Sequence, residues 1–306
     1  MTCFHPIPAY RSSEINPATG KRGLVFNSKH PLRLAEGKSM SVPCGKCIGC
    51  RLDRSRDWAV RCMHEAQSHS ENCFLTLTYD PKKLPEDYSV SKVVHQHFVK
   101  RLRESAGRPL RFFACGEYGS EDGALPLQPH YHYLIFGYRP TDLKLHTKTN
   151  NIPLYTSQKI SKLWPFGFST VGNVNYQTAA YCARYVVKKI GGDMAAEHYT
   201  RIHPITGKIC QVEPEFALQS RKPGIGYSWY QTFKNDIYPS DFCVVDTKRH
   251  PVPKFYIKLF EEEERQRVKR RRKAIANKHR EDATPSRLRV REAVQLDRAK
   301  QLKRSL

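Results

Sequence analysis

Two histidines that alternate with tyrosines are the residues whose spacing most directly suggests chemistry. His130 and His132 open the run 129–136, whose aromatic and branched apolar residues predict a buried strand. Residues two apart in a strand point to the same face. We therefore expect the two imidazoles to lie side by side and to hold one metal ion. Leu134 and Phe136 would continue that face into a core.

A second pair, His95 and His97, provides an internal comparison. It lies in the stretch 91–105, where apolar residues recur every four positions and Ser91 can cap a helix. Residues two apart in a helix diverge and do not face each other. The sequence therefore predicts surface or partly buried histidines here, and no ligand pair.

A carboxylate is expected to complete the metal site. Glu117 follows the predicted strand 110–115, and it falls near His130 and His132 if this strand pairs with 129–136 as a hairpin. Two imidazoles and one carboxylate with open positions suit Mg²⁺ or Mn²⁺ bound to a phosphate. Such an ion would act as a Lewis acid on the phosphate. The alternative for this glutamate is an ordinary turn carboxylate.

Two tyrosines form a candidate pair of nucleophiles. Tyr181 and Tyr185 lie four residues apart on a predicted helix, 178–190, so both hydroxyls leave one face. Lys188 continues this stripe, and Lys189 lies four residues beyond the second tyrosine. A phenol is a poor nucleophile at neutral pH, but a nearby metal or lysine favours the phenolate. Helix packing is the alternative for the tyrosine pair taken alone.

Three cysteines at two-residue gaps predict a second metal site. Cys44, Cys47 and Cys50 suit Zn²⁺, which takes four ligands, with a structural role. An iron–sulfur cluster and unliganded thiols are the alternatives. The fourth ligand is expected from Cys3, which we favour, or from His5 or Cys62.

The composition points to a polyanionic partner. The 306 residues include 52 Lys and Arg against 29 Asp and Glu, a formal charge of +23. We expect no membrane association, because no segment approaches the length of an apolar span and no signal peptide is evident. Ten cysteines without an export signal predict thiols or metal ligands in a reducing cytoplasm.

The elements that must position these residues alternate regularly. The order of predicted elements between residues 73 and 190 is β-α-β-β-α-β and a further helix, which predicts an α+β fold. Its expected form is the split βαβ (ferredoxin-like) arrangement, an antiparallel sheet with helices on one face. Residues 1–43 show little periodicity and are expected to form an irregular arm, and 51–68 a basic helix.

Several blocks of this sequence resemble one family in their order along the chain. They are Pro43-Cys-Gly-Lys-Cys47, Phe74-Leu-Thr-Leu-Thr78, Cys115-Gly-Glu-Tyr-Gly119, Pro129-His-Tyr-His132, Tyr181-x3-Tyr185-x2-Lys188 and Pro223-Gly-Ile-Gly226. The sequence resembles the replication initiators of single-stranded DNA phages of the Microviridae, gokushovirus branch, which are HUH endonucleases. The resemblance implies the HUH sheet, with Tyr131 at the middle position of the metal motif pointing away from the ion.

The resemblance also implies an organisation and an activity. Expected parts are 1–70, an arm with the zinc site and the basic helix; 71–192, the nuclease core; 193–260, an extension packing on the core; and 261–306, a basic helical or disordered tail. The activity would be rolling-circle replication, in which tyrosine attack nicks origin DNA in the cytoplasm of the infected bacterium. It leaves a 5′-phosphotyrosine, and a second transfer circularises the displaced single strand. Host helicase and polymerase would be partners.

Basic residues near these elements are expected to bind the DNA. They are Arg51, Arg54, Arg184, Lys189, Arg221 and Lys222. Two other functions stay open at this point. A non-catalytic zinc-knuckle protein would contact bases by stacking, and a plasmid-type initiator or relaxase would share the chemistry.

Overall fold

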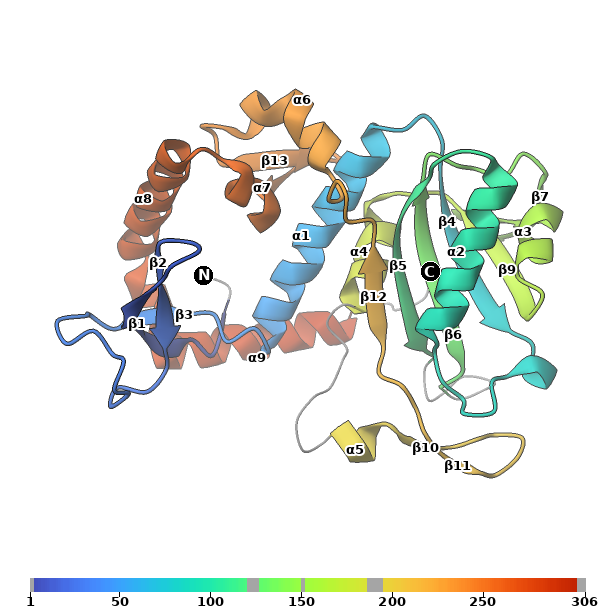
Figure 1. Ribbon diagram of the computed structural model, residues 1–306, viewed down its shortest axis with the longest axis horizontal. Helices are drawn as coiled ribbons and strands as arrows, with labels where there is room; N and C mark the ends of the chain where they lie inside the picture. Colours follow the sequence, from blue (N-terminus) through green and yellow to red (C-terminus); the bar gives the residue numbers. More distant parts are fainter. Residues whose placement is uncertain (1–2, 120–126, 150–151, 186–194, 302–306) are drawn as a thin grey trace. The chain divides into compact units, whose positions relative to one another are not determined.

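The computed structural model describes residues 3–119, 127–149, 152–185 and 195–301 (Figure 1). The described strands are β1 (Ile7–Asn16), β2 (Lys21–Val25), β3 (Met40–Val42), β4 (Asn72–Tyr79), β5 (Arg111–Tyr118), β6 (Pro129–Phe136), β7 (Leu143–Thr149), β8 (Ile152–Ser157), β9 (Gly167–Gly172), β10 (Thr200–Ile202), β11 (Ile209–Gln211), β12 (Phe216–Gln219), β13 (Phe242–Val245) and β14 (Lys248–Pro251). The described α-helices are α1 (Ile48–Gln67), α2 (Lys92–Ala106), α3 (Gln158–Leu163), α4 (Tyr176–Tyr185), α5 (Ala195–His198), α6 (Tyr227–Ile237), α7 (Lys254–Leu259), α8 (Glu262–Lys278) and α9 (Pro285–Gln301).

The chain divides into two compact units. One contains residues 1–53 together with 269–305, and the other contains residues 54–268. The boundaries fall inside α1 and α8. The N-terminal segment therefore shares a unit with the C-terminal helices, which the sequence analysis treated as a separate part.

A seven-stranded sheet in the order β12-β5-β6-β4-β9-β8-β7 is the centre of the second unit. All its described strand pairs are antiparallel. The four strands β5-β6-β4-β9 have the order of the predicted split βαβ arrangement, since β6 lies between β4 and β5. The α+β fold predicted from the sequence is thus confirmed, and the segment after residue 193 adds β12 beside β5.

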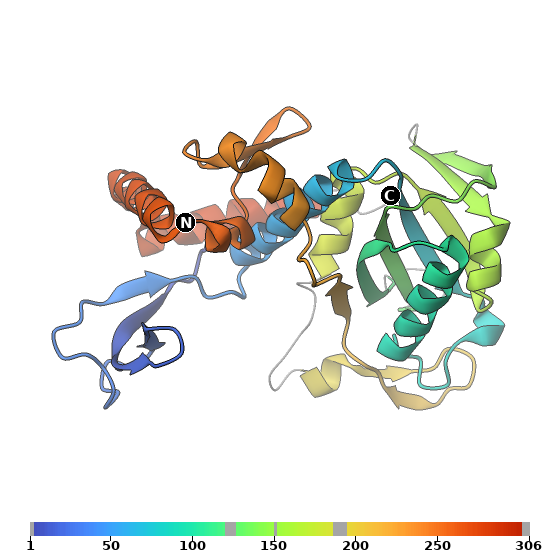
Figure 2. The same cartoon turned by 45° about the horizontal axis from the view of Figure 1, so that its top comes forward.

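The sheet has two covered faces because side chains alternate along each strand. Leu75 and Leu77 on β4 pack with Phe98 and Leu102 of α2 in one core, where α3 also contributes. Figures 1 and 2 show α2 and α3 on this same side of the sheet. The opposite face, for which the sequence analysis expected no helix, is covered by α4 and by the C-terminal part of α1. Its core contains residues from strands and both helices, namely Phe74, Phe113, Leu134, Phe136, Ala59, Cys62, Ala179 and Cys182.

The sequence predicted the limits of α2 closely, because both of its ends are capped. Ser91 precedes the helix, and its hydroxyl accepts a hydrogen bond from the Val94 amide. Gly107 follows it with φ of 60°, in the left-handed region where glycine has no steric cost. His95 is buried and His97 is exposed. The two side chains therefore diverge as expected, although His95 lies in the core and not at the surface.

Two regions differ from the expectations. Residues 7–42 were expected to be irregular but form the sheet β2-β1-β3. Their alternation is weak in sequence because most side chains are exposed; along β1 only Ala9 and Ser12 are buried. The hairpin β7–β8 was not predicted. It forms one edge of the large sheet, and its first strand is mostly exposed and polar.

Candidate functional site

The hairpin of β5 and β6 brings the three candidate metal ligands together. Glu117 pairs with His130 across the two strands, and His132 follows on the same face of β6. The Glu117 Oε1 atom lies 3.0 Å from His130 Nε2 and 2.8 Å from His132 Nε2. The strand β5 extends past the predicted end at residue 115, which places Glu117 within the paired region. The hairpin on which the position of this carboxylate depends is therefore present.

The other ring nitrogen of each histidine is held by a neighbour. His130 Nδ1 lies 3.0 Å from the carbonyl oxygen of Gln128 and, because a carbonyl only accepts, this nitrogen carries the proton. His132 Nδ1 lies 3.0 Å from the Thr76 hydroxyl, and its ring stacks on Phe74 with centroids 5.5 Å apart. Donation from Nδ1 is the tautomer that turns the Nε2 lone pair of each ring towards Glu117.

The environment keeps Glu117 ionised. Its side chain is only 1% exposed, and this burial alone would raise the pKa of the carboxyl. Hydrogen bonds and charges from His130 and His132 outweigh the burial and lower the pKa of Glu117 to about 2. A buried carboxylate is thus present at neutral pH, and its charge requires a proton on the imidazoles or a cation between them.

This donor set fits a divalent cation. The ligand atoms of Glu117, His130 and His132 all lie within 4.8 Å of one another. Two nitrogen lone pairs aimed at a carboxylate oxygen are stabilised when a cation lies among them. Two imidazoles and one carboxylate would leave several positions of the ion open for substrate, as Mn²⁺ or Mg²⁺ requires.

Helix α4 places a tyrosine over this site. Ala179 and Cys182 pack in the core under the helix, so the intervening Tyr181 lies at the site face. Its hydroxyl donates to Glu117 Oε1 at 3.3 Å, and its ring meets the His132 ring edge-on, with centroids 4.9 Å apart. The Arg184 guanidinium carbon lies 5.5 Å from the centre of the Tyr181 ring.

The start of α4 is fixed by a reciprocal pair of hydrogen bonds. The Asn175 side chain accepts from the Thr178 amide at 2.8 Å, and the Thr178 hydroxyl accepts from the Asn175 amide at 3.0 Å. Tyr185 is the last described residue of the helix. Its side chain, and the predicted residues Lys188 and Lys189, lie outside the described residues.

The predicted DNA-binding residues differ in exposure. Arg54 of α1 and Arg221 and Lys222, after β12, are exposed, whereas Arg51 and Arg184 are partly buried. Arg61, which the sequence placed with the basic residues of this helix, is only 8% exposed. Its guanidinium lies between the rings of Trp58 and Phe255 and donates to the Ile225 carbonyl, so Arg61 has a structural role.

Sequence reasoning did not assign roles to Thr76 and Gln128, the partners of the two histidines. The strand register supplies this information, since Thr76 pairs with His132 and Thr78 with His130 across β4 and β6. The threonines at alternate positions in β4 were the available signal, because they interrupt the apolar face on which the histidines stand.

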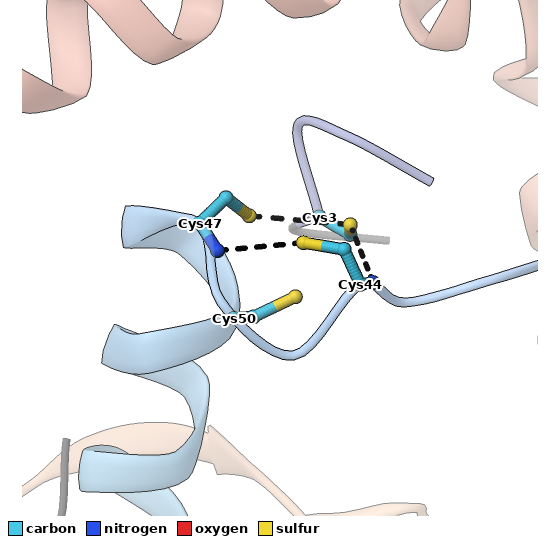
Figure 3. Close-up of side chains that lie close together, drawn as sticks. All are labelled: Cys3, Cys44, Cys47 and Cys50. Carbon is cyan, nitrogen blue, oxygen red and sulfur yellow. Dashed lines mark hydrogen bonds between the residues drawn. The ribbon is translucent and has the colours of Figure 1, made fainter. Parts of the chain in front are cut away.

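Four cysteines converge in the first unit (Figure 3). The Sγ atoms of Cys3, Cys44, Cys47 and Cys50 all lie within 4.8 Å of one another. These cysteines and the Glu117 site are the two groups in the described part of the chain that are close enough to hold a metal ion. Among the three residues considered for the fourth position, Cys3 is the one the structure brings to the cluster. His5 instead contacts Glu292, and Cys62 lies in the core of the large sheet.

Comparisons with known proteins agree with the motifs. A family model of the "Replication-associated protein" of ORF2 type matches residues 72–190. "Replication-associated protein VP4" of Bdellovibrio phage phiMH2K is 34% identical over 266 residues, which cover 84% of this chain and 76% of that protein. "Replication-associated protein ORF2" of Spiroplasma virus 4 is 33% identical over 286 residues, 86% of this chain and 81% of that protein.

A third relative, "Replication-associated protein ORF4" of Chlamydia phage 1, is 36% identical over 170 residues, 51% of this chain and 41% of that protein. No solved structure shows significant similarity to the chain. Within the described residues, none of the helices has the length and apolar character that crossing a bilayer demands. The identities and coverage confirm the resemblance drawn from the motifs, and the chain belongs to the family of replication-associated proteins of Microviridae-type phages.

Proposed function

We propose that this protein initiates rolling-circle replication as a metal-dependent, strand-specific DNA endonuclease and strand transferase. The observation that carries this proposal is the contact of Tyr181 with Glu117, the same carboxylate that meets His130 and His132. A nucleophile and a candidate cation site thus share one oxygen atom. Substrate phosphate bound at the cation would lie within reach of the phenol.

In this proposal Tyr181 is the nucleophile and the three ligands position the phosphate. A divalent ion held by Glu117, His130 and His132 would act as a Lewis acid on the scissile phosphate. The Tyr181 oxygen forms a bond to phosphorus while the bond from phosphorus to the 3′ oxygen breaks. The phenol proton leaves to solvent, and the 3′ oxygen takes up a proton, so a 5′-phosphotyrosine and a free 3′-hydroxyl remain. The cation of Arg184 favours the phenolate.

Tyr185, one helical turn further along α4, would perform the second transfer. It would attack the next origin phosphate and allow the first phosphotyrosine to be resealed by the free 3′-hydroxyl. Lys188 would support this phenolate. Host helicase and polymerase would extend the 3′ end between the two steps, in the cytoplasm of the infected bacterium.

The charge of the chain supports DNA as the substrate. The excess of 23 positive charges favours a polyanion, and Arg54, Arg221 and Lys222 are exposed in the unit that contains Glu117. A non-catalytic zinc-knuckle protein would explain this charge but not a tyrosine in contact with a His-His-Glu cluster. The similarity to phage proteins favours a phage initiator over a plasmid-type initiator or relaxase.

Formation of a covalent protein–DNA adduct tests the proposal. Full-length protein is incubated with Mn²⁺ and overlapping oligonucleotides from the viral positive strand, and adducts that survive denaturation are separated on a gel. We expect Tyr181→Phe to reduce the initial rate of the first cleavage by at least about 1,000-fold, because the variant lacks the nucleophilic oxygen. Tyr185→Phe is expected to have a smaller effect on this step.

A tyrosine at the start of the same helix supplies the control. Tyr176 packs against His250 with ring centroids 4.9 Å apart, so Tyr176→Phe should retain adduct formation. Strand cleavage that leaves no adduct would favour attack by water. An adduct that survives in the Tyr181→Phe/Tyr185→Phe double variant would rule out both nucleophiles.

A further inference from the structure

We infer that Cys3, Cys44, Cys47 and Cys50 bind a structural zinc ion that holds the N-terminal sheet β1–β3 to the start of α1. This inference is independent of the proposed nicking activity, because none of the four cysteines belongs to the unit that contains the large sheet. It rests on the geometry of the sulfurs, on the hydrogen bonds that they accept and on the sparse core of the segment that they enclose.

The spacing of the sulfurs matches one tetrahedral ion. Four ligands at the usual zinc–sulfur distance of about 2.3 Å place sulfurs about 3.8 Å apart. The Cys47 and Cys3 Sγ atoms are 3.9 Å apart, and all four sulfurs lie within 4.8 Å of one another (Figure 3). A four-iron cluster would bind each thiolate at a different iron and would need sulfurs much farther apart.

Backbone amides point at three of these sulfurs. The amide of Phe4 donates to Cys47 Sγ at 3.3 Å, and the amide of Cys44 donates to Cys3 Sγ at 3.2 Å. The amide of Cys47 donates to Cys44 Sγ at 3.4 Å. A thiolate accepts such bonds much better than a neutral thiol, and metal ligands commonly have partners of this kind. Four thiolates this close together would repel one another without a cation.

The local sequence builds this arrangement in two steps. Gly45 has φ of 77°, which lets the chain turn sharply between Cys44 and Cys47 so that both sulfurs face inward. Helix α1 then begins at Ile48, and Cys50 lies in its first turn, where the helix dipole favours a negative sulfur. The two-residue gaps of the motif are therefore a turn followed by a helix start.

The enclosed segment lacks a core of its own. Of residues 4–43, only Ala9, Ser12 and Val25 are buried, whereas Ile15 and Phe26 are more than half exposed. Strands β1 and β3 pair from Ile7–Val42 to Ala9–Met40, so Cys3 and Cys44 flank the open end of this pair. A metal ion at that end would tie both strands to α1, as metals do in other small structures without a sufficient core.

Metal analysis of the full-length chain tests the inference. The His130→Ala/His132→Ala variant is used, because it removes the other candidate site, and it is purified under reducing conditions without chelator. We expect about one zinc per chain and little iron. The further changes Cys44→Ser and Cys47→Ser should lower the zinc content at least about tenfold. Cys210→Ala, which replaces a buried cysteine outside the cluster, should leave the zinc content unchanged.

Absence of metal, iron accompanied by sulfide, or zinc that persists without Cys44 and Cys47 would each overturn the inference. Cobalt substitution gives an independent reading that does not need a cysteine variant to fold. Four thiolates produce intense sulfur-to-cobalt charge transfer and tetrahedral visible bands. Their absence from the cobalt form of the full-length chain would also overturn a tetrathiolate site.

Limited proteolysis tests the structural role. Extraction of the metal should speed cleavage within residues 4–43 at least about tenfold, because the open end of the β1–β3 pair is no longer held. Fragments from the large sheet, 72–172, should persist at the same rate in both forms. Equal protection of 4–43 with and without metal would contradict the stabilising role.

Discussion

A single carboxylate oxygen connects the elements of the site at the scale of residues. Glu117 Oε1 contacts His130, His132 and Tyr181, so a change at this atom would affect both cation binding and the nucleophile. The ring orientation of the histidines depends in turn on Thr76 and Gln128. These two partners never touch the substrate in our proposal, yet they decide which nitrogen is offered to a cation.

Replacing Thr76 tests this orienting role. Thr76→Val keeps the shape of the side chain but removes the hydroxyl that lies 3.0 Å from His132 Nδ1. We expect the Mn²⁺ concentration needed for half-maximal cleavage to rise by about 10- to 100-fold, because an unsupported imidazole is a poorer ligand. Titration of Mn²⁺ in the oligonucleotide cleavage assay measures this shift.

The control for this variant lies two residues along the same strand. The Thr78 hydroxyl donates to the carbonyl of Phe168, so Thr78→Val should leave the Mn²⁺ dependence nearly unchanged. Equal shifts for both variants would indicate general damage to β4. No shift for Thr76→Val would contradict the orienting role of its hydroxyl.

At the scale of elements, the alternation of side chains in the sheet separates chemistry from stability. One face of β6 presents His130 and His132 towards α4, and the other presents Tyr131 and Tyr133 towards α2. Tyr133 lies under His95, whose ring stacks on it with centroids 5.6 Å apart and whose Nδ1 lies 3.2 Å from its hydroxyl. A buried neutral histidine on this face makes stability sensitive to acid.

The pKa of His95 sets the range of this sensitivity. Burial lowers the pKa of His95 to about 4, whereas an unfolded histidine titrates near ~6.5. Between these values the unfolded chain binds more protons, so stability is fully present above pH ~6.5 and falls on acidification. Each such histidine contributes a slope of about 1.4 kcal/mol per pH unit.

We expect His95→Gln to reduce the fall in the free energy of unfolding between pH ~6.5 and pH ~4 by up to this slope. Glutamine stays neutral and can still bond the Tyr133 hydroxyl. Urea unfolding across this pH range measures the effect. His97→Gln, at the exposed position of the same helix, is the control and should keep the wild-type pH dependence. A wild-type pH dependence in His95→Gln would disprove the assignment.

At the scale of the whole molecule, positive charge is the dominant property. A formal charge of +23 predicts DNA affinity that falls steeply with salt. The two edges of the large sheet differ in what they present. Arg221 and Lys222 follow β12 at one edge, and Lys144 and Lys148 lie on β7 at the other. All four side chains are exposed, so charge alone does not distinguish the edges.

We expect the edge beside β5 to contact single-stranded DNA, because Glu117 lies on that strand. Arg221→Gln/Lys222→Gln should weaken binding and reduce the slope of log affinity against log salt by about 1.4, that is about 0.7 for each lost phosphate contact. Fluorescence anisotropy at several salt concentrations measures both quantities. Lys144→Gln/Lys148→Gln removes the same charge at the other edge, and an equal change in slope would show that the binding is not localised.

The sequence by itself determined the periodic elements and the types of the reactive groups. Alternation defined β4 and β6, and a four-residue repeat with Ser91 defined α2, since these segments bury one face and the burial is written into residue spacing. The motif His130-x-His132 indicated a ligand pair because strand geometry fixes residues two apart on one face. The cysteine motif likewise indicated three ligands of a second site.

Only the tertiary structure decided which distant residues meet. The register of β5 against β6 brought Glu117 to the histidines, and the packing of α4 brought Tyr181 to Glu117. Cys3 joined the cysteine cluster across 41 residues of chain, and an exposed sheet formed where no periodicity was visible. Spacing along a chain fixes neighbours within one helix or strand, but contacts between elements depend on how their buried faces pack.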